Sequence, residues 1–521
     1  MKRVQLRHDR RAGTLVLCLI AIAALSLMAA LTLERVGPKF RMAYQTAAWQ
    51  EARLAAEAGI DLAMAELSKN ATGNSPGDWL GWKQQTGGII GPAVANTLNT
   101  VLALLGPAAQ TSAPIFLDNV NVSAATGAQS EVDVQLWAVY PTATSNGRWF
   151  RIRAMATCGL APPAYAAPNS ADAAFRRYSL REVRPQLRKD DVGNPMSIPA
   201  PSASRAIEVL VEPILPFELA ILADRSLELS PGGTWCVDSY DSRDPLKSNA
   251  DGTYPGRTSP KVQENARIAS NLGRPATSLY GSLIDAHGTR VRGSVATNGG
   301  DDPSTSTREN IVDIAGIDPA RVRDDFYREM KSMARPSTGL FLPPPLLGGS
   351  FATGTEAAPA RYLVGGNLGA FTVAAPPPGV KGAVIIVVNG NLDVISGAIT
   401  IPPNVTAQIF VRGDIDFHGR PVNSGPGSGA RAASLQIYGE DPRGSVRTVR
   451  ASGTASVCAA FYGPGYDVQL NGGVEWSGSV IAHSFAILDA GSGGFHYDEA
   501  LATIGAPIGF RIARYVEDVR E

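Results

Sequence analysis

The spacing of apolar residues divides the chain into three parts. An uncharged apolar run extends from Thr14 to Leu33, and as a helix it is about 30 Å long, one hydrocarbon thickness of a bilayer. Behind it, apolar residues recur every three or four positions up to Leu67, as on one face of a helix. Further along, short runs alternate apolar and polar residues, which is typical of strands.

The segment after the apolar run is rich in strong helix formers. Its apolar stripe consists of Trp49, Ala52, Ala56, Ile60, Ala63 and Leu67. We expect this face to pack on a partner. Gly37 and Pro38 lie between the two halves, and the missing proline N–H predicts a kink or a short unwound stretch there.

Five basic residues precede the apolar run, and they favour a cytoplasmic N-terminus with everything after Glu34 outside the cytoplasm. They are Lys2, Arg3, Arg7, Arg10 and Arg11. We therefore expect a single-pass protein of the inner membrane. A cleaved secretory signal and a plain anchor followed by a coiled segment are the alternatives.

The leader ends in Arg10-Arg11-Ala12-Gly13, and the long helix contains Ala56-Glu57-Ala58-Gly59. With these motifs around the apolar run, the N-terminal region resembles the PilX-like minor pilin group of the type IV pilin-like proteins. The resemblance implies that a prepilin peptidase cuts after Gly13, which makes Thr14 the new N-terminus. Main-subunit pilins carry a glutamate at the fifth mature residue, whereas this chain has Cys18, which favours a minor subunit.

The middle of the chain predicts a small antiparallel sheet. Val132–Val139 and Trp149–Ala156 alternate and form a hairpin through 141–147, and Ile207–Glu212 adds a further strand. A long helix on this sheet gives an α+β domain over 34–215, which the pilin resemblance also implies.

From Phe217 onward short apolar runs alternate with glycine and asparagine turns. A Gly-polar-aliphatic step recurs at Gly281, Gly293, Gly390, Gly413 and Gly478, and the copies at Gly390 and Gly413 are 23 residues apart. This predicts an all-β lobe over 216–521 that is β-solenoid-like, resembling a right-handed β-helix. A jelly roll or a sandwich uses similar residues.

Two further helices are predicted outside this pattern. Val94–Leu105 is a possible short helix before the sheet. Asp318–Arg335 has helical spacing, beginning with Asp318-Pro319, and we expect it to be a helical insertion in the lobe.

Composition excludes several classes of function. The 47 Lys and Arg residues balance 47 Asp and Glu residues, and only 18% of residues are charged, so we expect no nucleic-acid partner. The four cysteines include no C-x-x-C pair. Of Cys158, Cys236 and Cys458, at most one pair can form a disulfide outside the cytoplasm.

Two short motifs, at 237–242 and 495–501, resemble a C-terminal module found attached to PilX-like N-termini, and that resemblance implies no activity. The candidate residues within them are Asp238, Tyr240, Asp241, His496, Tyr497, Asp498 and Glu499. His496 beside two carboxylates is able to act as a general base or bind a metal. A structural hydrogen-bond network that caps the lobe is the preferred interpretation.

The aspartates after residue 237 offer oxygen ligands for calcium, although their spacing is not that of an EF-hand. They are Asp238, Asp241, Asp244 and Asp251, with Asn249. Turn formation explains them as well. We expect no cofactor and no catalytic site, because the sequence has no nucleophile-elbow, phosphate-loop or H-E-x-x-H motif.

The favoured function is therefore that of a non-enzymatic, pilin-like structural protein. We expect a minor or tip subunit of a type IV pilus or a related secretion pseudopilus, with other pilins or pseudopilins, prepilin peptidase and a surface ligand as partners. The alternative is a membrane-anchored β-helix protein that binds or cleaves surface polysaccharide, with Asp393, Asp414 and Asp416 as its carboxylates. An anchored adhesin without a pilus is the third hypothesis.

Overall fold

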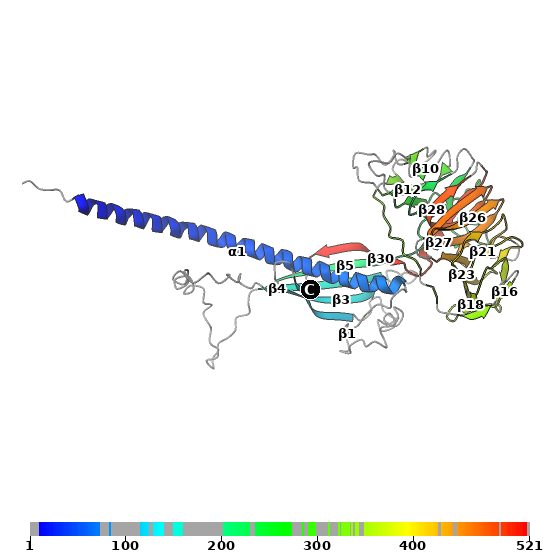
Figure 1. Ribbon diagram of the computed structural model, residues 1–521, viewed down its shortest axis with the longest axis horizontal. Helices are drawn as coiled ribbons and strands as arrows, with labels where there is room; N and C mark the ends of the chain where they lie inside the picture. Colours follow the sequence, from blue (N-terminus) through cyan, green and yellow to red (C-terminus); the bar gives the residue numbers. More distant parts are fainter. Residues whose placement is uncertain are drawn as a thin grey trace, which may run out of the picture.

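The structure is a computed structural model of the 521-residue chain. It describes residues 10–72, 83–84, 115–123, 129–139, 149–159, 202–229, 235–272, 284–285, 290–298, 311–312, 321–323, 325–333, 335–336, 339–342, 349–425, 429–440, 445–488 and 491–517. A long N-terminal helix extends from an antiparallel sheet, and a large β-rich region lies at the end of that sheet farthest from the N-terminus (Figure 1). The possible helix at Val94–Leu105 lies outside the described residues.

Helix α1 (Arg10–Thr72) has two halves with different surroundings. Its N-terminal half contains Leu17–Val36, a segment long and apolar enough to cross a membrane, none of which is buried. Its C-terminal half buries small and aliphatic side chains against the sheet, among them Ala52, Ile60 and Leu67. Trp49 does not belong to the buried stripe, since it is 49% exposed and lies beside the Arg205 guanidinium.

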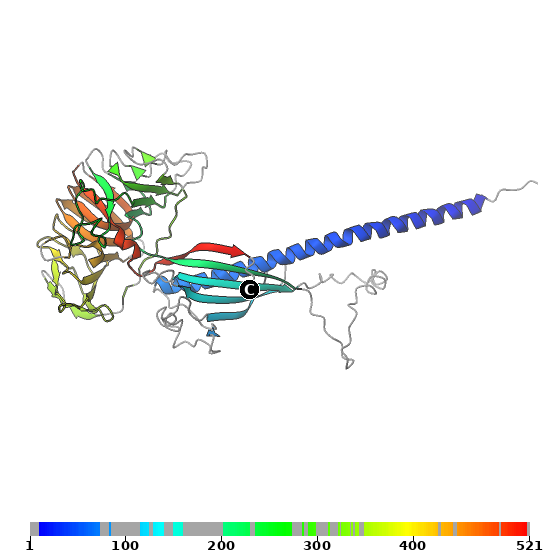
Figure 2. The same cartoon turned by 180° about the vertical axis from the view of Figure 1, so that it is seen from behind.

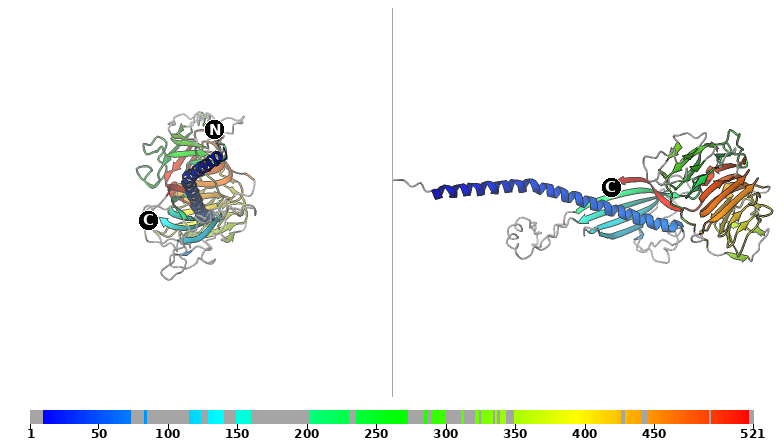
Figure 3. Two further views of the ribbon diagram at one scale, coloured as in Figure 1. Left: turned by 90° about the vertical axis from the view of Figure 1, so that its left-hand side faces the viewer. Right: turned by 45° about the horizontal axis from the view of Figure 1, so that its top comes forward.

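The helix does not unwind where proline was expected to interrupt it. The backbone is helical through Gly37 and Pro38, and α1 curves gently along its length (Figure 3). The predicted unwound stretch is therefore wrong. A proline inside a helix removes one hydrogen bond, and the remaining bonds of a long helix keep its two sides aligned.

The antiparallel sheet has six strands in the order β1-β2-β3-β4-β5-β30. They are β1 (Lys83–Gln84), β2 (Ile115–Ser123), β3 (Gln129–Val139), β4 (Trp149–Gly159), β5 (Ser202–Ile214) and β30 (Gly509–Glu517). The predicted hairpin strands and the strand at 207–212 are confirmed. Val134, Ala154 and Ile207 are register partners on neighbouring strands, and all three are buried in one core with α1.

The outermost strand of this sheet comes from the far end of the sequence. β30 pairs antiparallel with β5, with Gly509 opposite Ile214, and Phe510 packs edge-on against Phe150. Residues 215–508 therefore form an insertion between two adjacent strands (Figure 2). The expected division at residue 215 misses this return of the chain, because nothing local in the 509–517 segment identifies its partner.

The β-rich region consists of three ladders of mostly parallel strands. The first ladder contains, in spatial order, β15 (Leu340–Leu342), β18 (Ala360–Val364), β20 (Gly382–Val388), β23 (Val405–Val411), β25 (Leu435–Gly439), β27 (Ser456–Gly472), β28 (Glu475–Ile487), β6 (Ile221–Ala223), β9 (Ala266–Ser270), β12 (Gly293–Thr297) and β14 (Val322–Arg323). Among the described strand pairs of this region, only that of β20 with β17 (Gly354–Thr355) is antiparallel.

The second and third ladders share the long strands β27 and β28 with the first. The second adds β21 (Leu392–Asp393), β24 (Ile415–Asp416), β26 (Arg447–Gly453), β7 (Leu227–Glu228), β10 (Ile284–Asp285) and β13 (Ile311–Val312). The third adds β29 (Gly494–Asp498), β8 (Cys236–Tyr240) and β11 (Arg290–Val291). Isolated bridges through Val422 continue it into a separate three-stranded sheet of β16 (Gly349–Phe351), β19 (Phe371–Val373) and β22 (Ile399–Thr400). The described residues of the region also include two short 3-10 helices, η4 (Ala432–Ser434) and η5 (Glu499–Thr503).

Apolar side chains stack in register along the first ladder. The row runs through Leu340, Tyr362, Ile386, Ile409, Ile437, Phe461, Val480, Ile221, Ile268, Val295 and Val322. The order of the strands gives the path of the chain along the ladder. The chain enters in the middle at β6, proceeds to one end at β14, and then begins again at the other end with β15. The last strands, β28 and β29, return to meet the first strands, β6 and β8.

The glycines of the repeated step permit a ladder of polar side chains at one corner. Asn367 Oδ1 accepts a hydrogen bond from Asn391 N, and Asn391 Oδ1 accepts one from Asp414 N. A Cβ added at Gly413 would lie 2.1 Å from Asn391 Oδ1, so only glycine fits beneath that side chain. The 23-residue spacing thus places successive turns on top of one another.

The predicted helical insertion at Asp318–Arg335 is wrong. In its described residues the chain forms β14 and then an extended segment without α-helix. Arg328 N and O bond the side chain of Asn271, the Arg328 guanidinium pairs with Glu218, and Lys331 O accepts from Tyr462. This segment runs along the C-terminal ends of first-ladder strands. Its spacing places the partly buried Phe326, Met330 and Met333 against the core.

Candidate functional site

The two sequence motifs lie side by side although they are far apart in the chain. β8 and β29 pair in parallel, with Asp238 opposite His496 and Tyr240 opposite Asp498. On one side of this pair, Val237 and Phe495 belong to the hydrophobic core. This is the seam at which the last turn of the chain closes on the first, and nothing in either motif alone predicts the pairing.

His496 lies on the other side of the pair and is completely buried. Its Nδ1 is 2.7 Å from Asp238 Oδ1, and its Nε2 is 2.7 Å from Glu475 Oε2. Tyr254 stacks on the imidazole with a ring-centroid distance of 3.6 Å. The fit is close, because a Cβ added at Gly494 would lie 2.6 Å from His496 Nε2.

The electrostatics of this group favour a doubly protonated imidazole. Burial lowers the pKa of His496, but the hydrogen bonds and charges of Asp238 and Glu475 outweigh burial and raise the pKa. Glu475 in turn pairs with the Arg257 guanidinium. Burial raises the pKa of Glu475, whereas His496 and Arg257 together lower it. The ring therefore donates a hydrogen bond from each nitrogen.

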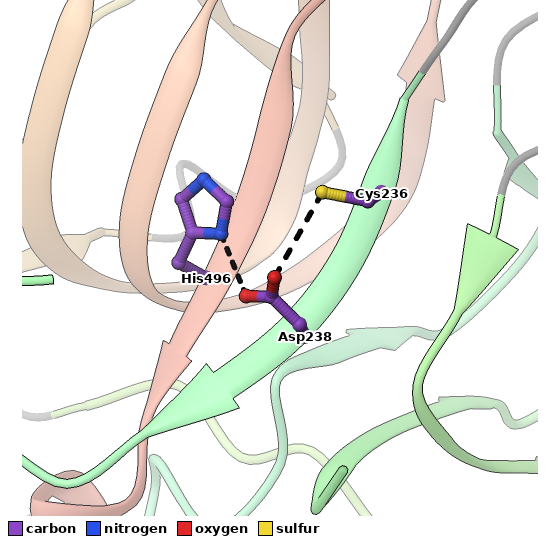
Figure 4. A group of neighbouring side chains, drawn as sticks. All are labelled: Cys236, Asp238 and His496. Carbon is purple, nitrogen blue, oxygen red and sulfur yellow. Dashed lines mark hydrogen bonds and ion pairs between the residues drawn. The ribbon is translucent and has the colours of Figure 1, made fainter. Parts of the chain in front are cut away.

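Cys236 completes a group of three possible metal ligands. Its Sγ is 3.9 Å from Asp238 Oδ2, which also accepts a 2.8 Å hydrogen bond from the Tyr254 hydroxyl. The ligand atoms of Cys236, Asp238 and His496 lie within 4.8 Å of one another (Figure 4). Burial and the Asp238 charge raise the pKa of the thiol to about 12. It is the single group of this kind within the described part of the chain.

The other predicted residues of the second motif, Tyr497, Asp498 and Glu499, form hydrogen bonds that connect neighbouring segments to the seam. The Tyr497 hydroxyl donates to Phe217 O at 2.9 Å. Asp498 Oδ1 accepts from Ser242 N at 3.0 Å and from Ala500 N at 3.1 Å, and it caps η5. Burial raises the pKa of Asp498 to about 6. Glu499 accepts from the Ser239 hydroxyl and the Asn265 amide.

Apart from Asp238, the residues expected to form a calcium loop make hydrogen bonds within the loop itself. Asp241 pairs with Arg243, Asp244 accepts from Leu246 N, and Asp251 accepts from Thr253 N and its hydroxyl. Tyr240 is buried and packs edge-on against Tyr254. Calcium binding by this loop stays a prediction.

The proposed polysaccharide carboxylates lie on the second ladder. Asp393 and Asp416 are register partners, and His418 Nε2 is 2.7 Å from Asp393 Oδ1. Asp414 does not join them, because its Oδ1 accepts from Thr448 N at the corner. Gly13 and Thr14, the expected processing site, lie in the first turns of α1.

Sequence reasoning missed four members of the buried group: Cys236, Tyr254, Arg257 and Glu475. Cys236 was the easiest to find, since it lies two residues before Asp238 and therefore on the same side of a strand. Glu475 lies 21 residues before His496, and its place near the histidine follows only from the pairing of β28 with β29, in which Glu475 is the partner of Gly494. No disulfide joins Cys18, Cys158, Cys236 and Cys458 in the structure.

Part of the β-rich region is similar to a known protein family. Residues 380–504 match a family described as a domain of unknown function, DUF7305. The match includes Glu475 and His496 but not β8. No curated protein matches the chain. The competence-associated pilin ComZ from Thermus thermophilus aligns over 91% of this chain and 98% of its own, with 11% identity and a TM-score of 0.22, a likeness too low to carry an argument.

Proposed function

We propose that this protein is a non-enzymatic, pilin-like structural protein. It is a minor or tip subunit of a type IV pilus or of a related secretion pseudopilus. The inner membrane holds it through the apolar half of α1, with its N-terminus in the cytoplasm. Other pilins or pseudopilins and a prepilin peptidase are its partners, and the β-rich region is presented for assembly or adhesion.

The division of α1 into two halves carries this proposal. None of the Leu17–Val36 segment is buried within the protein, whereas the following turns pack on the antiparallel sheet through Ala56, Ile60 and Ala63. A helix that ends inside one subunit needs no apolar extension of this length. An exposed apolar half is suited first to a bilayer and then to packing against the helices of neighbouring subunits.

The position of the β-rich region supports a place at a tip. It lies beyond the end of the sheet, away from the apolar half of α1 (Figure 2). We propose that it is a β-helix-like lobe, since its three parallel ladders stack apolar rows around one core. A subunit within a filament must contact neighbours on all sides, and a lobe of this size obstructs such packing.

The deciding experiment is processing and assembly in the native host. Terminal sequencing of the mature protein should begin at Thr14, and the protein should appear among sheared surface filaments. Gly13→Ala should retain the leader and leave the filament fraction, because the peptidase requires the glycine before its cut. Gly37→Ala, a change of the same kind farther along α1, should be processed normally.

An intact Met1 in a host that processes its other pilins would contradict the proposal. That result would favour a membrane-anchored protein that binds or cleaves polysaccharide. The row formed by Asp393, Asp416 and His418 is the cluster on which such a function would rest.

A further inference from the structure

We propose that Cys236, Asp238 and His496 bind a divalent transition metal, with zinc the ion that suits them best. The three ligand atoms lie within 4.8 Å of one another, and Asp238 and His496 are 99% buried. They lie on two adjacent strands, so that the backbone already holds them together (Figure 4). This proposal does not depend on the pilin function.

The ligand types select the metal. A thiolate, an imidazole and a carboxylate together are typical of zinc sites, whereas calcium and magnesium take oxygen ligands. Three protein ligands leave one of the four tetrahedral positions to water. Cys236 is only partly buried, which gives the ion a path from solvent.

The surroundings of the ligands resemble the outer shell of a metal site. A metal-bound histidine commonly donates its second ring N–H to a carboxylate, which orients the ring. His496 has Glu475 at Nε2, and Arg257 holds Glu475 in place. Asp238 is oriented by the Tyr254 hydroxyl.

Zinc would bind His496 at Nδ1, the ring nitrogen that faces Asp238 and lies 2.7 Å from Asp238 Oδ1. The ion would therefore take the place of the proton between these two atoms and of the Cys236 thiol proton, and both protons would be released to solvent.

The metal would connect β8, near the start of the β-rich region, with β29, near its end. Asp238 and His496 are 258 residues apart, and the chain between them includes nearly the whole winding path. An ion that binds only the closed arrangement stabilises it by mass action. The bound ion would therefore stabilise the pairing of β8 with β29 at the seam.

The test uses the full chain purified in detergent, stripped with a chelator and titrated with zinc sulfate. Metal analysis after dialysis should find one zinc ion per chain, and zinc should raise the melting temperature. Cobalt in place of zinc should produce a cobalt–thiolate charge-transfer absorption. Cys236→Ser should lose the absorption and the retained zinc, whereas Cys158→Ser, which changes a buried thiol on β4, should keep both.

A second variant separates metal binding from folding. Glu475→Gln keeps the shape of a side chain that binds no metal itself and should weaken zinc binding about 10- to 100-fold. Circular dichroism of each variant checks that it is folded. The proposal is overturned if the folded parent retains no zinc, or if Cys236→Ser and Cys158→Ser bind zinc equally.

Discussion

The antiparallel sheet and the β-rich region bury similar side chains, but their strands obtain their pairing partners differently. In the antiparallel sheet, β2, β3, β4 and β5 are neighbours in the sequence and in space. In the β-rich region the first strand, β6, pairs with the last long strand, β28. Ile221 of β6 is the register partner of Val480 of β28. Local pattern therefore determines most of the first sheet, whereas the second depends on a closure between distant segments.

The difference predicts where each region is vulnerable. The antiparallel sheet relies on close approach of α1, because a Cβ added at Gly59 would lie 2.8 Å from Val132 Cγ1 and 3.0 Å from Val134 Cγ2. The β-rich region relies on unbroken rows of aliphatic side chains and on one seam. Each region can be weakened by a change that leaves the other intact.

The largest expected effect is in the apolar row of the first ladder. Ile386 is completely buried between Tyr362 and Ile409, so Ile386→Ala should lower the free energy of unfolding by about 2 to 4 kcal/mol through lost burial and a cavity. Urea unfolding of the full chain in detergent measures it. Ile395→Ala, at a side chain 59% exposed, is the matched control, and equal losses for the two would contradict a continuous core.

The second expected effect is a pH dependence of the free energy of unfolding that comes from Asp498 at the seam. The pKa of Asp498 is raised from 3.8 to about 6 by burial, so the folded state holds a proton that the unfolded state has lost. Stability should therefore fall by about 3 kcal/mol as the pH rises through this window. Asp498→Asn, which stays neutral, should remove this part of the pH dependence.

Unfolding at closely spaced pH values measures the difference between parent and variant. The His496 pKa is raised above 6.5, so its contribution is lost at higher pH and can be separated. If Asp498→Asn showed the same fall in stability between pH 3.8 and about 6, Asp498 would not be its source.

The smallest expected effect is at the contact between α1 and the sheet. Gly59→Ala places a Cβ 2.8 Å from Val132 Cγ1 and should destabilise the protein by about 1 to 2 kcal/mol, although alanine is the better helix former. Leu54→Ala, on the exposed side of the same helix, is the control. A stabilised Gly59→Ala variant would show that the helix does not pack as closely as the structure indicates.

The sequence was sufficient to predict elements whose packing partners are near in the chain, and elements that have no packing partner. The amphipathic half of α1 and the strands at 132–139 and 149–156 follow from periodicity, because each buries one face locally. The helical spacing at Asp318–Arg335 led to a wrong prediction of a helix. A non-helical segment beside a ladder also packs Phe326, Met330 and Met333 against one surface.

For the candidate site, the sequence identified His496, Asp238 and their neighbours as notable residues but did not bring them together. Cys236 and Glu475 were missed because their relation to His496 is set by the pairings of β8 and β28 with β29. A titratable side chain acquires its role from the charges around it, and these came from strands far away in the sequence.

By itself the sequence determined the apolar span, the helix that follows it, the alternating strands and the glycine-asparagine turns, because each depends on the backbone and on residues a few positions away. Only the tertiary structure decided that β30 returns to β5, that the last turn closes on the first, and that Cys236, Asp238 and His496 meet. The physical reason is that parallel pairing joins strands without fixing their distance along the chain, so the burial of the whole core selects the partners.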